Sequence, residues 1–256
     1  MKLRLISDLH TEFWKADNIA KVSKIFAKEL PPLPTDPETT LVLAGDTGSL
    51  HRPTQYCWLL DIAAERFKHV VWVGGNHEWY GGSWVTDQKF YQKELDKRKI
   101  FYDFENEIEG VTFICTTLWT DFEKENPLLM QEARVRMNDY RQIEHLSVDA
   151  VLAEHKILLE KIRSSLEKRR EKTVVVTHHA PSFQSIHDDY RTDRLNGCYA
   201  SDLEYLMLQY EPAFWLHGHV HMYKNYFVGK TNVVCNPLGY RGYEKNNHKK
   251  ELILEI

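Results

Sequence analysis

The chain has 256 residues, of which 43% are hydrophobic and 12% aromatic. This is enough apolar surface for a substantial core, so a wholly disordered chain is excluded. The 33 basic and 37 acidic residues leave a formal net charge of −4, and we therefore do not expect general electrostatic binding to nucleic acid.

The number and spacing of the cysteines and the hydropathy of the sequence indicate the cellular compartment of the protein. The four cysteines are scattered and form no C-x-x-C pair, so we expect reduced thiols in a reducing compartment. No apolar run approaches the roughly 20 residues that cross a bilayer, and the N-terminus lacks the pattern of a signal peptide. We therefore expect a soluble, cytoplasmic protein that does not bind membranes.

Short β-branched runs alternate with helical patterns along most of the chain. The predicted strands are Leu3–Ser7, Thr40–Ala44, His69–Val73, Val111–Leu118, Thr173–Thr177 and Ala213–Leu216. The predicted helices are Asp17–Leu30, Gln55–Phe67, Thr86–Lys97 and Val148–Arg170. Three closely spaced strand patterns then indicate antiparallel pairing, and these are Asn225–Val228, Val233–Cys235 and Leu252–Ile256. We expect one α/β domain over residues 1–256, built around a central sheet or a pair of sheets.

Polar clusters follow five of these strands, at the point where each strand ends. They are Asp8 and His10; Gly45-Asp46; Gly75-Asn76-His77-Glu78; His178-His179; and Gly218-His219-Val220-His221. Ligands of open α/β sheets bind beyond the carboxyl ends of the strands, so we expect the clusters to meet there. In extended chain, residues i and i+2 project to the same side, so each Asp-x-His or His-x-His pair presents two side chains to one small region.

These residue types are suited to metal binding. Neutral imidazole and carboxylate bind zinc, iron or manganese, and the set offers more ligands than one ion requires. Two ions about 3.5–4 Å apart that share a carboxylate would use the set well. Each motif is weak alone, since Asp-x-His is most often a surface or capping pair and Gly-Asp a turn. The specific signal is their ordered combination at strand ends.

The ordered set resembles the signature of the calcineurin-like metallophosphoesterase superfamily, which reads Asp-x-His, Gly-Asp, Gly-Asn-His-Asp/Glu, a strand ending in His, and Gly-His-x-His. The resemblance spans residues 8 to 221 and is greatest to the small phosphodiesterase and phosphatase members. It implies a four-layer α/β sandwich of two mixed β-sheets flanked by helices. It also implies two divalent or trivalent metal ions, which are manganese, iron or zinc.

The resemblance further implies the role of each motif residue. The ligands that it implies are Asp8, His10 and His221 for the first ion, Asn76, His178 and His219 for the second, and Asp46 as a bridge between both. A hydroxide between the ions attacks phosphorus in line, and His77 stabilises the developing charge and protonates the leaving group. Asp46 is thus catalytic together with His77, and Asn76 also contacts the substrate. His178 is preferred to His179 because the family ligand is the first histidine after the strand.

Charge arithmetic supports these roles independently. Two divalent ions carry four positive charges, while Asp8, Asp46 and a hydroxide carry three negative ones. A site with a net charge of about +1 attracts an anionic phosphate and still lowers the pKa of its water.

Three departures from family patterns narrow the class. Gly45-Asp46-Thr47-Gly48-Ser49-Leu50 lacks the Gly-Asp-x-x-Asp-Arg-Gly of serine/threonine protein phosphatases. Asn76 is followed by His77 rather than Arg, which argues against the UDP-diacylglucosamine hydrolase branch. The 35 residues after His221 leave little room for the capping domain of nuclease members.

Two weaker features have alternative interpretations. Arg191 and Arg194 either bind the substrate phosphate or form local ion pairs in a solvated loop. Aromatic side chains near the motif loops either stack on a nucleobase or aryl group or, as we favour, pack in the core and at its rim. These are Trp14, Trp79, Tyr80, Trp84, Trp119, Tyr190, Tyr199 and Tyr223.

We therefore predict a dinuclear metal-dependent phosphoesterase whose substrate is a small phosphodiester or phosphomonoester, nucleotides included. The alternative is a non-catalytic metal-binding or protein-interaction scaffold of the same fold, as in a retromer subunit of the superfamily, although His77 and every ligand position are intact here. A mononuclear iron oxygenase would leave Asp46, Asn76 and His77 without a purpose. The sequence does not indicate an oligomeric state.

Overall fold

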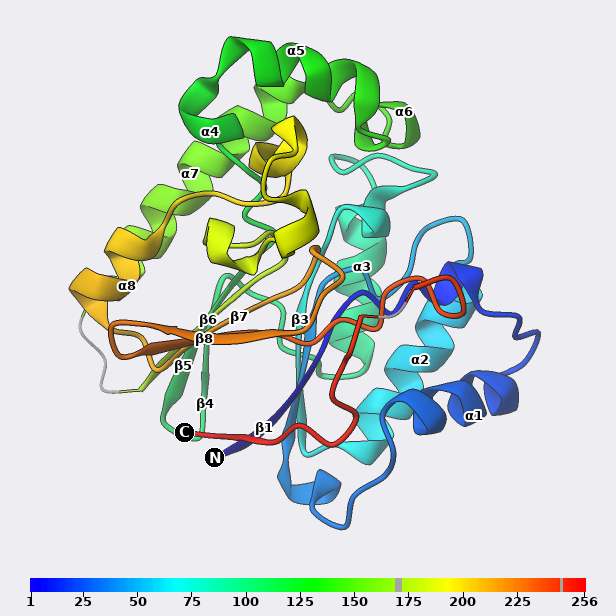
Figure 1. The fold of residues 1–256 in the computed structure, drawn as a ribbon. Helices are drawn as coiled ribbons and strands as arrows, with labels where there is room; N and C mark the ends of the chain where they lie inside the picture. Colours follow the sequence, from blue (N-terminus) through cyan, green and yellow to red (C-terminus); the bar gives the residue numbers. More distant parts are fainter. Residues whose placement is uncertain (169–171, 245) are drawn as a thin grey trace.

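The computed structural model describes residues 1–168, 172–244 and 246–256. Two mixed sheets stack face to face, and helices cover both outer faces (Figure 1). The predicted four-layer α/β sandwich is thus confirmed. The predicted strands and helices are present with bounds within two residues of those expected, except for the long helix. That helix ends at Leu166, earlier than predicted, and Arg169 and Arg170, which the prediction included, lie outside the described residues.

The first sheet has the strand order β10-β1-β2-β3 among the described residues. Its parallel strands are β1 (Lys2–Ile6), β2 (Thr40–Ala44) and β3 (His69–Val73), and β10 (Leu254–Glu255) joins β1 in antiparallel pairing. Side chains alternate between the two faces. In β2, Val42 and Ala44 pack between the sheets, whereas Leu41 and Leu43 pack against the helices.

The second sheet has the order β4-β5-β6-β7-β9-β8 over the same described ranges. Its central parallel strands are β5 (Val111–Thr116), β6 (Thr173–Thr177), β7 (Phe214–His217) and β9 (Thr231–Cys235). Its antiparallel edges are β4 (Glu105–Ile108) and β8 (Lys224–Val228). The expected antiparallel pairing near the C-terminus is therefore present in β8 and β9, but β10 belongs to the first sheet.

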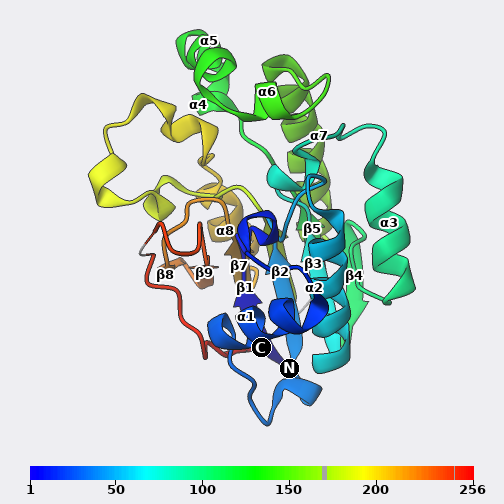
Figure 2. The same ribbon diagram turned by 90° about the vertical axis from the view of Figure 1, so that its right-hand side faces the viewer.

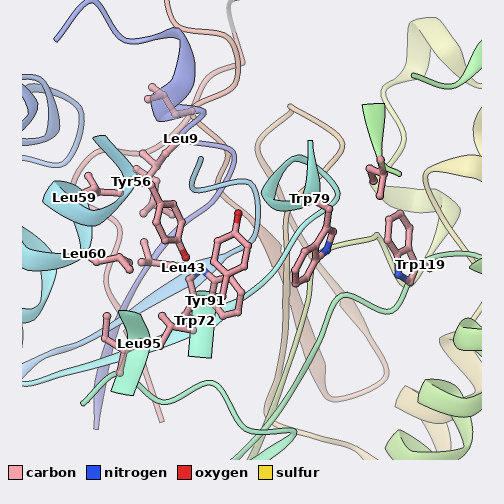
Figure 3. Close-up of a cluster of buried hydrophobic side chains, with 14 of the residues drawn as sticks. Leu9, Leu43, Tyr56, Leu59, Leu60, Trp72, Trp79, Tyr91, Leu95 and Trp119 are labelled. Atoms are coloured by element: carbon pink, nitrogen blue, oxygen red, sulfur yellow. The ribbon is translucent and has the colours of Figure 1, made fainter. Parts of the chain in front are cut away.

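Helices bury apolar faces on the outer side of each sheet. The first sheet is covered by α1 (Ile19–Glu29), α2 (Pro53–Arg66) and α3 (Gln88–Lys97). The second is covered by α7 (Val148–Leu166) and α8 (Glu204–Tyr210). Figure 3 shows Tyr91 and Leu95 of α3 beside Trp72 of β3, and the rings of Trp72 and Tyr91 stack with centroids 5.7 Å apart. Each such buried side chain contributes about 1.5–3 kcal/mol to folding.

A helical segment that the sequence did not predict follows β5. We call it the α4–α6 segment (residues 122–142), and it comprises α4 (Phe122–Glu125), α5 (Pro127–Arg136) and α6 (Asp139–Gln142). The four α4 residues have φ angles between +51° and +65°, so this turn is left-handed. Figures 1 and 2 both show α5 and α6 at the end of the molecule where the parallel strands finish.

Two observations bear on the expected location. All four cysteines are described and carry free thiols. Within the described residues, no helix combines the length and apolar character that crossing a bilayer requires. The cytoplasmic location stays a prediction.

Candidate active site

The predicted site residues converge where the parallel strands of both sheets end. Asp8 and His10 follow β1, Asp46 follows β2, Asn76 and His77 follow β3, His178 follows β6, and His219 and His221 follow β7. Seven of these eight side chains are buried and His221 is half-buried. The structure thus brings together all seven predicted ligands and His77.

One group of donor atoms surrounds His221. Its Nε2 lies 3.1 Å from Nε2 of His10 and 3.4 Å from Oδ1 of Asp8. The outer Nδ1 atoms face carboxylates, at 3.2 Å from Glu12 for His10 and 2.8 Å from Glu244 for His221. Since a carboxylate only accepts hydrogen bonds, each Nδ1 carries the proton in the neutral ring, and each Nε2 lone pair points inward.

A second group surrounds His178. Its Nε2 lies 3.1 Å from Oδ1 of Asn76 and 3.2 Å from Nδ1 of His219. Its Nδ1 donates to the carbonyl of Ala44 at 3.0 Å, so the Nε2 of the neutral ring is an acceptor. Asp46 lies between the two groups, with Oδ2 3.4 Å from Nε2 of His178 and 3.7 Å from Nε2 of His10.

This arrangement fits the metals that the resemblance implies. Nitrogen and oxygen lone pairs that face one another at hydrogen-bond distance repel unless a positive charge lies among them. Among the described residues, three three-residue sets have donor atoms within 4.8 Å of one another. Two consist of predicted ligands, namely Asp8, His10 and His221, and Asp46, His178 and His219, and the third is His10, Glu12 and His77. Imidazole and carboxylate donors suit zinc, iron and manganese, and outer hydrogen bonds of this kind orient metal-binding histidines.

The charges at the site favour a bound cation. Burial alone would lower the pKa of His178, but Asp46 and Asp8 raise it to about 9. Burial would likewise lower the pKa of His221, but Asp8 and Glu244 raise it to about 10. The carboxylates therefore attract positive charge. In the metal-free protein, protons on the histidines supply this charge, and metal ions compete with these protons for the site.

Five of the seven predicted ligands have left-handed backbone conformations. The φ angles are +54° for Asp8, +47° for His10, +52° for Asp46, +70° for His219 and +45° for His221. The Asp-x-His and His-x-His pairs therefore converge, but not by the alternation of an extended strand, because β1 and β7 have already ended. Asp and His adopt this conformation more readily than most residues.

Close packing around the ligands requires glycine at several positions, and it is tightest at Gly45 and Gly75. A Cβ on Gly45, where φ is +88°, would overlap the imidazole of His178. A Cβ on Gly75 would overlap Oδ1 of Asp46. Only glycine allows the backbone to approach these side chains so closely.

Glu78 of the third motif joins the loops after β2 and β3. It is buried, and its Oε2 accepts hydrogen bonds from the backbone N–H groups of Asp46 at 2.9 Å and Gly75 at 2.6 Å. Its Oε1 accepts from the N–H of Thr47 at 2.7 Å. Glu78 thus fixes the backbone that carries Asp46.

His77 lies beside the donor groups and lines the cavity described below. Its backbone N–H donates to Oδ1 of Asp46 at 2.9 Å, and its Nδ1 lies 3.0 Å from Oε1 of Glu12. Its ring stacks on Tyr80 with centroids 4.0 Å apart, and Nε2 lies 3.4 Å from the hydroxyl of Tyr240. Burial would lower the pKa of His77, but Asp46 and Glu12 raise it, which favours a protonated ring.

His179 supports a neighbouring ligand instead of facing the donor groups. The centroid of its ring lies 4.1 Å from the ring centroid of His219. The ring centroid of Tyr199 lies 5.0 Å from that of His219 on the same basis. Nδ1 of His179 lies 3.2 Å from the carbonyl of Thr117. Of the two adjacent histidines, His178 is therefore the one whose nitrogen faces Asp46.

A cavity of about 420 Å³ opens beside these residues. One wall consists of residues 136–139 of the α4–α6 segment. Another wall consists of residues from the 186–199 loop. Aromatic rings line it, namely Tyr80, Tyr190, Tyr199 and Tyr240. Among the described lining residues, Arg136 is the one lysine or arginine, whereas Asp139, Asp193 and Glu244 are acidic.

Arg191 and Arg194 do not line this cavity, so of the two interpretations the structure favours local ion pairs in a solvated loop, and the substrate residues stay a prediction. The side chain of Arg191 is 69% exposed and pairs with Asp188 at 2.8 Å. That of Arg194 is 84% exposed and lies 3.6 Å from Glu132.

Sequence reasoning missed several residues at the site. These are Glu12, Tyr240, Glu244, Arg136 and Asp139. Glu12 continues the i, i+2 spacing of Asp8 and His10, which was a usable signal, while the others lie far from any motif. Of the aromatic residues, Trp14, Trp79 and Trp119 are buried in the core as favoured, whereas Tyr80, Tyr190 and Tyr199 line the cavity.

The fold and the donor set define a metallophosphoesterase. A family model for calcineurin-like phosphoesterases matches residues 1–223, and the chain belongs to this family. It is therefore a metal-dependent phosphoric ester hydrolase.

Individual proteins are similar to the chain over different lengths. The uncharacterized protein L509 of Acanthamoeba polyphaga mimivirus is 24% identical over 279 aligned residues, which cover 99% of this chain and 96% of that protein. The [acyl-carrier-protein] phosphodiesterase PptH of Mycobacterium tuberculosis (strain ATCC 25618 / H37Rv) is 36% identical over 83 residues, 32% of this chain and 21% of that protein. The crystal structure of this phosphopantetheinyl hydrolase superposes with a TM-score of 0.70 at 19% identity, covering 96% of this chain and 93% of that one.

Proposed function

We propose that this chain hydrolyses a small phosphodiester with the help of two metal ions. The observation that carries the proposal is the charge of the cavity wall. A phosphomonoester carries a charge of about −1.5 to −2 at pH 7, whereas a diester carries one negative charge. The lower charge suits this cavity better.

The lining residues support that preference. Arg136 is the one lysine or arginine in the described part of the wall, and its guanidinium lies 3.6 Å from Glu132. Asp193 and Glu244 add negative charge. A second charge on the substrate would meet acidic groups instead of cations, and like charges in proximity are unfavourable.

The proposed ligands are Asp8, His10 and His221 for one ion, Asn76, His178 and His219 for the other, and Asp46 for both. Two ions held there supply positive charge that attracts the phosphate and lowers the pKa of a water nucleophile. The chain itself supplies the leaving-group proton. His77 holds Nδ1–H toward Glu12 and donates the proton on Nε2 to the leaving oxygen as its bond to phosphorus breaks.

The side of the cavity that the tyrosine rings line has room for an uncharged substituent of the diester. Tyr80, Tyr190 and Tyr199 offer ring faces on which a flat or apolar group can pack. The mycobacterial relative is an [acyl-carrier-protein] phosphodiesterase, so acyl carrier protein is a substrate to include beside small diesters.

The test measures kcat/KM on bis-p-nitrophenyl phosphate and p-nitrophenyl phosphate in the presence of manganese, after metal analysis of the protein. We expect about two ions per chain and a preference for the diester. Faster cleavage of the monoester would refute the substrate assignment, and a chain that binds metal without hydrolysing any ester would support the scaffold alternative.

A charge variant makes the test specific to the cavity. Asp193→Asn keeps a side-chain oxygen that accepts from the N–H of Leu195, a bond of 2.8 Å in the wild type. It removes one negative charge, so we expect the ratio of monoester to diester activity to rise. Asp188→Asn is the matched control, because Asp188 is exposed in the same loop and does not line the cavity. An equal ratio in both variants would count against the charge argument.

A further inference from the structure

Asp139 lies at the first position of α6, outside every sequence motif, yet it reaches the donor groups. It is only 4% exposed. Its Oδ1 accepts a hydrogen bond from Nδ2 of Asn76 at 2.7 Å and another from the hydroxyl of Tyr80 at 2.8 Å. One carboxylate oxygen therefore contacts two residues that follow β3.

The first contact determines which end of the Asn76 amide faces the ligands. The oxygen and nitrogen ends of an asparagine side chain have nearly the same shape, so packing alone does not distinguish them. A carboxylate accepts hydrogen bonds and does not donate them, so it binds Nδ2. Oδ1 is thereby directed to the other side, where it lies 3.1 Å from Nε2 of His178.

The second contact acts on His77. The hydroxyl of Tyr80 is held by Asp139, and the ring of Tyr80 stacks on that of His77 with an interplanar angle of 22°. The same carboxylate thus fixes a proposed ligand directly and the proposed proton donor through an aromatic ring.

We propose that Asp139 is a positioning residue that orients the amide oxygen of Asn76 toward the metal, so that the α4–α6 segment is part of the metal site. This inference rests on the proposed role of Asn76 as a ligand. A purely structural role, in which Asp139 only anchors α6, would leave metal affinity unchanged as long as the chain folds.

The experiment removes the carboxylate that allows only one orientation of the Asn76 amide. In Asp139→Asn, the new amide can donate to Oδ1 of Asn76 and turn the Nδ2 end inward. We expect the affinity for one of two manganese ions to fall about 10–100-fold, the usual effect of losing an outer hydrogen bond to a ligand. The double variant Asn76→Asp with Asp139→Asn restores a donor–acceptor pair and places an oxygen inward, so we expect it to regain most of that affinity.

Isothermal titration with manganese measures these affinities without any substrate, and circular dichroism checks the fold. Tyr80→Phe is the matched control for the second contact. It removes the other hydrogen bond to Oδ1, and we expect wild-type affinity for both ions.

The outcomes separate this inference from the proposed function. A wild-type protein that binds fewer than two ions overturns the dinuclear proposal itself. A wild-type protein that binds two, with Asp139→Asn unchanged in affinity, overturns the role of Asp139. Should Asp139→Asn not fold, the double variant is compared with Asn76→Asp alone, and tighter binding of two ions by the double variant supports the inference. Loss of an ion from the double variant, or its failure to fold, refutes it.

Discussion

Oε1 of Glu12 lies 3.0 Å from Nδ1 of His77 in the interior of the protein. The same oxygen lies 3.2 Å from Nδ1 of His10. Burial would raise the pKa of Glu12, but hydrogen bonds with the two histidines lower it to about 2. Glu12 is thus an anion at neutral pH, and it fixes the proton of each imidazole on the side away from the cavity.

We expect Glu12→Gln to lower kcat about 10–100-fold, as losses of outer hydrogen bonds to site residues do. The amide has no charge, and its nitrogen end can face either ring. Steady-state kinetics on a phosphodiester will measure the change. Glu251→Gln, at an exposed position, is the control, and equal activity of both variants would contradict the role of Glu12.

Replacement of His77 by alanine separates proton transfer from metal binding. We expect His77→Ala to lose about 10²–10⁴-fold in kcat, the range for a lost general acid, and to retain both ions. The loss will be greater for an alkyl leaving group than for p-nitrophenolate, which needs less protonation. Metal analysis checks the second part, and loss of an ion would show that His77 is a ligand.

The arginines provide a test of the substrate pocket. Arg136 lines the cavity, whereas Arg191 and Arg194 do not. We expect Arg136→Ala to raise KM for the diester by at most about fivefold, since an exposed charge interaction contributes up to about 1 kcal/mol. Arg191→Ala and Arg194→Ala should have wild-type kinetics, and a raised KM in either would place the substrate elsewhere.

Metal uptake should depend on pH with a defined sign. The raised pKa values of His178, about 9, and His221, about 10, mean that both rings are protonated near pH 7.5 in the metal-free protein. A metal must displace these protons, so its affinity rises with pH until both pKa values are passed. Calorimetry in two buffers of different ionisation enthalpy will count the protons, of which we expect about two per pair of ions. Heats that are equal in both buffers would contradict this.

Much of the fold could be predicted because local and tertiary signals agree. β2 reads as a β-branched, apolar run and is buried on both faces, so its predicted range Thr40–Ala44 is the observed one. Within the α4–α6 segment, α4 could not be predicted, because Phe122–Glu125 adopts a left-handed turn that residue preference disfavours. Its conformation comes from contacts with α5 and the 194–198 turn.

Some features of the site could likewise be predicted from the sequence, and others could not. The histidines and carboxylates near strand ends could be found from spacing, although their roles as ligands stay predictions. The partners that orient them could not be found. Asp139 is 63 residues from Asn76 in the chain, and Glu244 meets His221 from a loop after β9. These distant acceptors determine which end of the Asn76 amide and which ring nitrogen of His221 face inward.

The left-handed conformations of Asp8, His10, Asp46, His219 and His221 have a consequence for the life of the protein in a cell. A newly made chain must adopt these disfavoured angles and bring lone pairs together before a bound cation can stabilise the fold. Each ion that binds only the folded form adds about 2.7 kcal/mol of stability when it is present at 100 times its Kd. We therefore expect a metal-starved chain to melt at a lower temperature and to be digested sooner by proteases, so that the amount of enzyme follows the metal supply.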